Sequence, residues 1–289
     1  MDTRLHKHCL GFYTAVDKPS VDDLKDYYSN KYFQTNKGNY RSKYTSLEQN
    51  YFNEKIKQYA YVVEKLRGVT PGSMLDVGCG EGFALAHFLG LNWHVDGLDF
   101  NDAGIRNKNP VCLPYLETGD VFELLENRLY GNYKYDLIWL TNVLEHVPDP
   151  IRLLAQLRGL LSTTGVLVVA VPNDFSDLQE VCLKNGYVDN RFWIGLPDHL
   201  SYFNAASLRA AAESTGYKCR YTLADFPIDL FLLNPNSNYI KNKSLGPDAH
   251  HARIQFENLI AQKPLDDVIA YYEAMAKVGL GRQIISFFM

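Results

Sequence analysis

Two histidines and a glutamate have the chemistry needed to move a proton. Glu145 and His146 are neighbours near the middle of the chain, and His199 lies in a later segment, Asp198–Phe203. An imidazole titrates near neutral pH, so either histidine could take a proton from a hydroxyl group. Each histidine alone could also be structural. We predict that Glu145, His146 and His199 are catalytic.

The elements that must position these residues begin at a glycine-rich stretch. Met74–Val77 is a short apolar run typical of a buried strand, and Phe83–Leu89 has helical spacing. Between them lies Asp76-x-Gly78-x-Gly80-x-Gly82, which differs from the Gly-x-Gly-x-x-Gly of dinucleotide enzymes. Glycine permits a tight turn and lets a ligand approach the backbone. The stretch predicts the first unit of a nucleotide-binding α/β sheet, although an ordinary glycine-rich strand–helix turn would look similar.

An acidic residue ends the next predicted strand. His94–Phe100 reads as the second strand, and its Asp99 lies 23 positions after Asp76. That interval is near the one at which an acidic residue reaches ribose hydroxyls. A carboxylate can accept hydrogen bonds from two adjacent hydroxyls. We predict that Asp99 binds a ribose, and the alternative is a surface aspartate at the end of a strand.

Further strands and helices continue the alternating pattern along the chain. Predicted strands lie at 114–116, 135–140, 166–171, 218–223 and 282–288, and predicted helices at 47–67, 122–129, 150–161, 204–215 and 251–279. Asp120, Asp149 and Asn204 precede three of these helices and suit the N-cap position. Residues 174–197 are irregular, and 234–247 reads as a loop rich in Asn, Pro and Ser. Aromatic clusters at 27–33 and 39–44 follow a short predicted helix at 22–28, and this segment is either a cap packed on the sheet or part of a substrate lid.

The composition limits the class of protein. The chain has 289 residues, of which 46% are hydrophobic and 21% charged, as in soluble globular proteins. It contains no apolar run long enough for a signal peptide or a membrane span, so we expect a cytoplasmic protein with no membrane partner. Five scattered cysteines form no Cys-x-x-Cys pair, which fits reduced thiols. A formal charge of −4 argues against a nucleic-acid partner.

The motifs together resemble the class I S-adenosylmethionine-dependent methyltransferases over residues 71–223. They occur in the order of that family: the glycine motif, Asp99, Gly119-Asp120, and the segment Asn142–Pro150. The resemblance implies a Rossmann-like, doubly wound, mostly parallel α/β sheet with an antiparallel edge strand. Residues 1–70 would then be an N-terminal cap, and 224–281 an insertion that serves as a substrate lid or as an oligomer contact such as that of a homodimer. Residues 282–289 would be the final edge strand.

The same resemblance implies the cofactor and its site. S-adenosylmethionine would be the cofactor and S-adenosylhomocysteine the product. Asp76 and the glycine backbone of the motif would hold the amino-acid end of the cofactor. Asp120 would accept a hydrogen bond from the adenine amino group, and its neighbour Val121 would pack on the adenine ring. The implied cofactor-binding residues are Asp76, Gly78, Gly80, Gly82, Asp99, Asp120, Val121 and Asn142.

The acceptor and the use of a metal are less constrained. Asn142–Pro150 is similar to the corresponding segment of ubiquinone-type and sugar O-methyltransferases. Sugar 3-C-methyltransferases share the Asp198–Phe203 pattern, but they begin with a cysteine-rich zinc module and this chain has only Cys9 there. We therefore predict methylation of a hydroxyl of a small molecule, and the acceptor that we favour is a sugar or a nucleotide-linked sugar. The alternatives are a quinone-like or small aromatic acceptor, and a non-catalytic cofactor-binding scaffold.

A metal site is the alternative to a histidine base. Small-RNA 3′-terminal 2′-O-methyltransferases have a related Glu-x-x-Glu-His segment that binds a divalent ion with a distant histidine. The equivalent ligands here would be Glu145, His146 and His199, but Asn142 replaces the first glutamate. Loss of that carboxylate weakens a site for a hard cation. We predict that the protein uses no metal.

Overall fold

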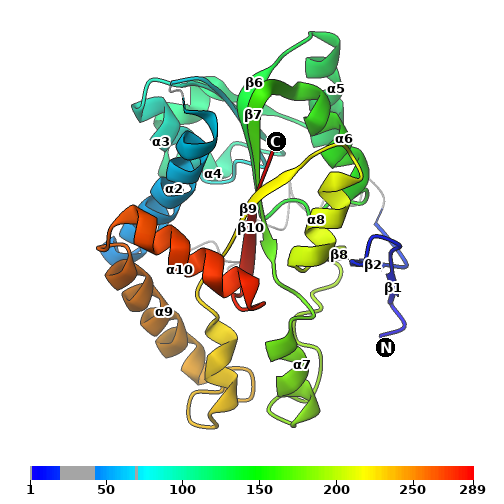
Figure 1. The fold of residues 1–289 in the computed structure, drawn as a ribbon, viewed down its shortest axis with the longest axis vertical. Coiled ribbons are helices and arrows are strands. Elements are labelled where there is room, and N and C mark those ends of the chain that lie inside the picture. The colour runs from blue at the N-terminus through cyan, green and yellow to red at the C-terminus, as the bar shows by residue number, and fades with distance from the viewer. Residues whose placement is uncertain (1, 20–42, 69–70) are drawn as a thin grey trace.

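A seven-stranded sheet forms the centre of the protein. The computed structural model (Figure 1) describes residues 2–19, 43–68 and 71–289. Its sheet has the order β5-β4-β3-β6-β7-β10-β9. The first five of these strands are parallel, and β10 is antiparallel to both of its neighbours. The strands are β3 (Ser73–Val77), β4 (His94–Asp99), β5 (Leu116–Thr118), β6 (Tyr135–Thr141), β7 (Leu161–Pro172), β9 (Cys219–Ala224) and β10 (Gln283–Phe288). The predicted Rossmann-like α/β fold is therefore confirmed.

The position of the final strand differs from the expectation. β10 was expected at the edge of the sheet, but it lies between β7 and β9, and β9 is the outermost strand. The physical reason is hydrophobicity on both faces. Ile284, Ile285, Phe287 and Phe288 of β10 are almost completely buried because they alternate between the two cores that helices cover, and so apolar a strand favours the interior of the sheet. In β9 only Leu223 and Ala224 are buried, which suits the edge.

Helices cover both faces of the sheet (Figure 1). One face packs on α5 (Val121–Tyr130), α6 (Pro150–Leu160) and α8 (Ala205–Glu213), and the other on α2 (Ser46–Arg67), α3 (Phe83–Gly90), α4 (Ala103–Lys108) and α10 (Leu265–Lys277). Alternate residues of β7 enter the two cores: Leu167, Val169 and Val171 face one, and Val166, Val168 and Ala170 face the other. This two-sided burial explains why the strand is an unbroken apolar run.

The predicted helix caps are confirmed. Asp149 accepts a hydrogen bond from the Arg152 amide at the start of α6, and Asn204 accepts from the Ser207 amide at the start of α8. α2 begins with a capping box in which Thr45 and Glu48 satisfy each other's backbone amides. These caps fix the directions in which α6 and α8 leave the loops that carry the predicted catalytic residues.

Several elements between the predicted strands were missed or merged. α7 (Asp177–Lys184) lies inside the segment expected to be irregular, and it starts with a capping box of Ser176 and Gln179. The expected loop at 234–247 contains η3 (Lys243–Leu245) and the buried Asn238, whose amide donates to two backbone carbonyls. The helix expected at 251–279 is two helices, α9 (Gly246–Ile260) and α10. Two further 3₁₀ turns are η1 (Pro110–Tyr115) and η2 (Ile228–Leu233).

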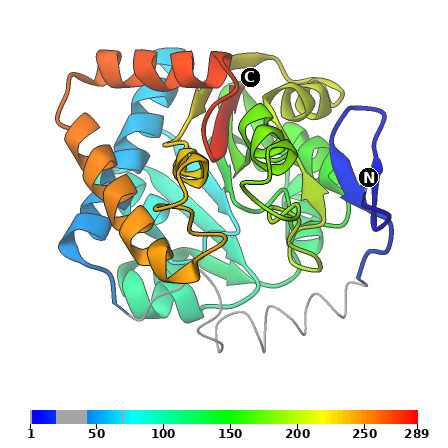
Figure 2. The same cartoon turned by 90° about the horizontal axis from the view of Figure 1, so that it is seen from below.

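A small second sheet joins the N-terminal residues to the middle of the chain. β1 (Leu5–Lys7), β2 (Tyr13–Ala15) and β8 (Ser201–Tyr202) pair antiparallel in that order. Figure 2 shows the blue N-terminal strands at the end of the molecule opposite α9 and α10. The predicted helix at 22–28 and most of the aromatic clusters at 27–44 lie outside the described residues. Among the helices of the described ranges, we find none that is long and apolar enough for a bilayer.

Candidate functional site

The glycine motif forms a tight turn between β3 and α3. Gly78, Gly80 and Gly82 all have positive φ, of 69°, 55° and 73°, a region that side-chain-bearing residues rarely adopt. A Cβ atom on Gly78 would lie 2.4 Å from a methyl group of Val143. The turn is also packed closely from the other side, because a Cβ on Gly104 of α4 would lie 2.3 Å from the carbonyl oxygen of Gly80. The motif therefore requires glycine for both conformation and space.

Asp99 holds this turn in place. It ends β4, which pairs with β3, and its Oδ2 accepts a hydrogen bond from the Gly80 amide at 2.8 Å. Burial raises the pKa of Asp99, and the hydrogen bond from Gly80 opposes that shift. The structure thus brings together the predicted ribose-binding acid and the predicted cofactor turn. Its role toward a ribose stays a prediction.

Asp76 is the most buried acid of the motif. It is only 3% exposed, and burial together with the nearby charge of Asp99 raises its pKa to about 8. The carboxyl of Asp76 is therefore protonated at neutral pH in the unliganded protein. A buried acid that is neutral until a cation arrives suits a site for a positively charged ligand.

Asp120 acts as a helix cap. Its Oδ1 accepts from the amides of Phe122 and Glu123 at 2.9 and 3.1 Å, so the N-cap alternative is observed directly. The Gly119 amide donates to the carbonyl oxygen of Asp99 at 2.9 Å, which places Asp120 and Val121 beside the end of β4. Capping does not use the other carboxylate oxygen. The proposed contacts of Asp120 and Val121 with adenine stay a prediction.

Asn142 follows β6 and lies beside the last strand of the chain. Its backbone has a positive φ of 56°, and its side-chain oxygen accepts from Nε2 of Gln283 at 2.7 Å. Gln283 begins β10, next to the carboxyl end of β7. No sequence motif pointed to Gln283. Its position could be inferred only once β10 was known to insert beside β7.

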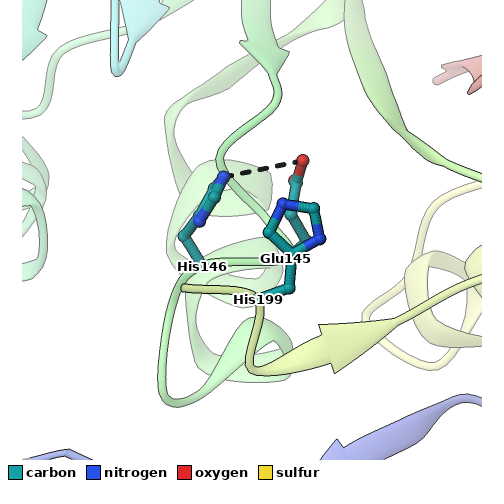
Figure 3. Close-up of side chains that lie close together, drawn as sticks. All are labelled: Glu145, His146 and His199. Atoms are coloured by element: carbon teal, nitrogen blue, oxygen red, sulfur yellow. Dashed lines mark ion pairs between the residues drawn. The ribbon is translucent and has the colours of Figure 1, made fainter. Parts of the chain in front are cut away.

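The three predicted catalytic side chains come together in one cluster (Figure 3). His146 Nε2 lies 3.8 Å from Glu145 Oε1, and the rings of His146 and His199 are 4.8 Å apart and nearly perpendicular. The backbone explains this proximity: the carbonyl oxygen of Glu145 accepts from the amides of Leu200 and Ser201 at 2.7 and 3.0 Å. The segment that carries His199 is therefore bonded directly to the loop after β6.

Electrostatics give the two histidines opposite protonation states. Burial lowers the pKa of His146, but hydrogen bonding to Asp198 and the charge of Glu145 outweigh it and raise this pKa to about 9. The ring is oriented by its Nδ1, which donates to the carbonyl oxygen of Asp198 at 2.8 Å. Burial and the charge of His146 lower the pKa of His199 to about 4. These shifts favour a protonated His146 and a neutral His199.

His199 and Glu145 also have unused hydrogen-bonding atoms. Nδ1 of His199 and Oε2 of Glu145 are buried and have no hydrogen-bond partner among the described residues. Glu145 is 1% exposed, and burial raises its pKa to about 7. Buried polar atoms without partners are costly, which is why they concentrate where a ligand completes the site.

Comparison with known proteins agrees with this geometry. Residues 48–222, more than half of the chain, match a family described as a methyltransferase domain. The chain belongs to this methyltransferase family. Its sheet order, glycine turn and strand-end acid are those of a class I, S-adenosylmethionine-dependent methyltransferase, as the motifs predicted.

Individual relatives are distant. The methyltransferase is 27% identical over 168 residues to a ubiquinone biosynthesis O-methyltransferase of Histophilus somni, an alignment that covers 55% of this chain and 70% of the relative. A methyltransferase from Archaeoglobus fulgidus superposes with a TM-score of 0.51 at 17% identity, covering 84% and 94% of the two chains. The [4+2]-cyclase SpnF superposes with a TM-score of 0.50 at 14% identity, covering 86% and 85%. These structures support the fold alone.

The methyltransferase also has a buried ion pair that the sequence did not reveal. Asp174 follows β7, is 1% exposed, and accepts from Nη1 of Arg282 at 3.0 Å. The charge of Arg282 contributes to the lowered pKa of His199. The ion pair therefore belongs to the electrostatic surroundings of the predicted base.

The cluster of predicted catalytic residues also has the donor atoms to hold a metal ion in this methyltransferase. Glu145, His146 and His199 each offer one ligand atom, and these atoms lie within 4.8 Å of one another. Two imidazoles and a carboxylate suit a divalent transition metal. Asn142, at the position of a fourth ligand, instead accepts from Gln283. The prediction that no metal is used remains to be tested by experiment.

Proposed function

We propose that this methyltransferase transfers a methyl group to a hydroxyl of a small molecule and that His199 is the general base. The observation that carries the proposal is the contact between the two histidine rings, 4.8 Å apart, together with the buried Nδ1 of His199 that has no hydrogen-bond partner among the described residues. A neutral imidazole can accept a proton, whereas His146, held by Asp198 and Glu145, already carries one. A positioned base contributes roughly 100- to 10,000-fold to such a reaction.

We infer that the predicted cofactor residues bind S-adenosylmethionine at the carboxyl ends of β3, β4 and β6. The cofactor supplies a methyl group on a sulfonium sulfur, which an oxygen nucleophile displaces. The positive-φ glycine turn lets the ligand reach the backbone, and Asp99 would accept from the ribose hydroxyls. The carboxylate of Asp76 would then be ionised and would lie near the positive charge of the cofactor.

Bound S-adenosylmethionine would supply the methyl group to the acceptor oxygen, and its sulfur would leave as S-adenosylhomocysteine. His199 would take the proton of the hydroxyl. Alignment of the two reactants can contribute about 7–11 kcal/mol to such a displacement. Glu145 and Asp198 keep His146 oriented, so that His199 has a fixed neighbour.

The acceptor class separates two versions of the proposal. A sugar or nucleotide-linked sugar follows from the resemblance of Asn142–Pro150 and Asp198–Phe203 to sugar methyltransferases. A quinone-like phenol is favoured by the ubiquinone biosynthesis O-methyltransferase found among the relatives. The proposed lid role of residues 224–281 and the homodimer also await tests. The cyclase with the same fold shows why a chemistry other than methyl transfer must be tested too.

A product screen tests the proposal. The protein is incubated with isotope-labelled S-adenosylmethionine and separate panels of sugar nucleotides, free sugars and phenols, and products are identified by mass spectrometry. We expect one panel to yield a labelled methyl ether. If the cofactor binds in calorimetry but no panel is methylated, the O-methyltransferase proposal is wrong and the scaffold alternative is favoured. If a chelator removes activity and a divalent cation restores it, the cluster is a metal site and not a base.

The buried Asp76 makes cofactor binding depend on pH. Because the pKa of Asp76 is raised to about 8, the unliganded folded protein favours the protonated carboxyl. The contribution of Asp76 to the free energy of unfolding is therefore lost as the pH rises through 8. A cationic cofactor favours the ionised form. We expect proton release on binding and tighter binding as the pH rises toward 8, measured by calorimetry in buffers of different ionisation enthalpy. Asp76→Asn should show neither effect, and equal proton release in both proteins would refute the assignment.

A further inference from the structure

The peptide after His199 is bonded on two sides. The amide of Leu200 donates to the carbonyl oxygen of Glu145 at 2.7 Å, and the carbonyl oxygen of Leu200 accepts from the amide of Ala15 at 2.8 Å. Leu200 itself is completely buried. The backbone beside His199 is therefore fixed between the catalytic loop after β6 and the N-terminal strand β2.

The contact with β2 continues along the segment that follows His199. Thr14 pairs with Ser201 and Tyr13 with Tyr202, and Thr14 is 2% exposed. Side chains extend the contact, since the rings of Phe12 and Phe203 lie 4.8 Å apart. A hairpin of β1 and β2 would be weak alone, and pairing with β8 makes it a three-stranded sheet, so β2 helps to hold β8 in position.

The N-terminal residues also reach the loop of the other histidine. The Lys18 ammonium donates to the carbonyl oxygen of Pro148 at 2.5 Å, two residues after His146. Arg4, on the far side of β2, accepts from the amide of Val16 through its carbonyl oxygen at 2.9 Å. Phe12–Ala15 and Lys18, which we name the N-terminal brace, thus contact both loops that carry histidines.

We propose that the N-terminal brace is a positioning device that fixes His199 relative to His146 and is required for methyl transfer but not for cofactor binding. This inference rests on the proposed function of the two histidines. The brace bonds to the segments of His146 and His199, whereas the glycine turn and Asp99 are held by β3, β4 and α4. A displacement of about 1 Å in a catalytic group can cost on the order of 100-fold in rate.

Two proline substitutions at adjacent positions test the proposal. Ala15→Pro removes the amide that donates to Leu200, and the control Val16→Pro removes the amide that donates to Arg4. In both cases the preceding residue lies in extended β2, which is the conformation that proline favours before it. We expect Ala15→Pro to lower kcat about 10-fold or more with an unchanged dissociation constant for S-adenosylmethionine, and Val16→Pro to change kcat less than 2-fold.

Hydrogen exchange separates this inference from the proposed function. We expect Ala15→Pro, but not Val16→Pro, to speed exchange of the Leu200 and Ser201 amides that donate to Glu145. If the wild type methylates no hydroxyl, the proposed function is wrong while the exchange rates still test the brace. Equal kcat values or equal exchange rates in the two variants would overturn the brace.

A third variant covers the case in which Ala15→Pro does not fold. Lys18→Met removes only the exposed bond to Pro148, so it should leave folding intact. We expect kcat to fall several-fold while calorimetric binding of the cofactor is unchanged. Unchanged kcat in Lys18→Met would count against the brace.

Discussion

Replacing His199 with glutamine should lower kcat for methyl transfer by roughly 100- to 10,000-fold, the range attributed to a positioned general base. His199 is the neutral member of the histidine pair, because burial and the charge of His146 lower its pKa to about 4. Its buried Nδ1 has no hydrogen-bond partner among the described residues, so this nitrogen is not already committed to another group. Glutamine keeps the size and polarity of the side chain but cannot accept the proton at neutral pH.

Two measurements make this result specific. Calorimetry with S-adenosylmethionine should give the same dissociation constant for His199→Gln and the wild type, since the glycine turn and Asp99 are unchanged. The matched control is His251→Gln, at an exposed position of α9. His251→Gln should retain wild-type kcat. Turnover by His199→Gln near the wild-type rate would remove His199 as the base and leave His146 or a metal ion to be examined.

Asp99→Ala should raise the dissociation constant of S-adenosylmethionine about 100-fold. Its carboxylate holds the Gly80 amide at 2.8 Å and is the proposed acceptor of ribose hydroxyls. Hydrogen bonds to a charged group contribute about 1.5–3 kcal/mol each, and each 1.4 kcal/mol is tenfold in affinity. Loss of the carboxylate affects both the shape of the turn and the direct contact, so the effect should exceed that of a single bond.

The control for Asp99 is an acid nearby in sequence. Asp102 is half exposed and pairs with Arg106, so Asp102→Ala should bind the cofactor as the wild type does. Thermal unfolding of each variant shows whether Asp99→Ala remains folded. Tight cofactor binding by folded Asp99→Ala would mean that the ribose lies elsewhere.

Local signals in the sequence predicted the parts of the fold that depend on few residues. The apolar runs at Met74–Val77 and Val166–Val171 appear as β3 and the buried part of β7, and the caps at Asp149 and Asn204 begin α6 and α8. Periodicity and capping are properties of neighbouring residues, which explains their success. α7 was missed although Ser176 and Gln179 form its capping box, because the helix is short and its surroundings are irregular.

Features that depend on distant contacts could not be predicted in the same way. The lateral position of β10 depends on which strand pairs with β7, and no local pattern encodes that choice. The grouping of Glu145, His146 and His199 was expected, but the opposite protonation of the histidines depends on burial and on Asp198. By contrast, the cap that Asp120 forms on α5 depends only on neighbouring residues, and its position before an apolar helix already suggested it.

The insertion of β10 between β7 and β9 has a consequence for assembly of the protein during synthesis. β10 follows every other strand of the large sheet in the chain. It pairs with β7 on one side and with β9 on the other. A nascent chain that stops at residue 281 therefore leaves the apolar strand β7 with one unpaired edge, and such an edge is prone to aggregation. Arg282 and Gln283 arrive with the same strand, so the region around Asp174 and Asn142 is completed only when the sheet closes.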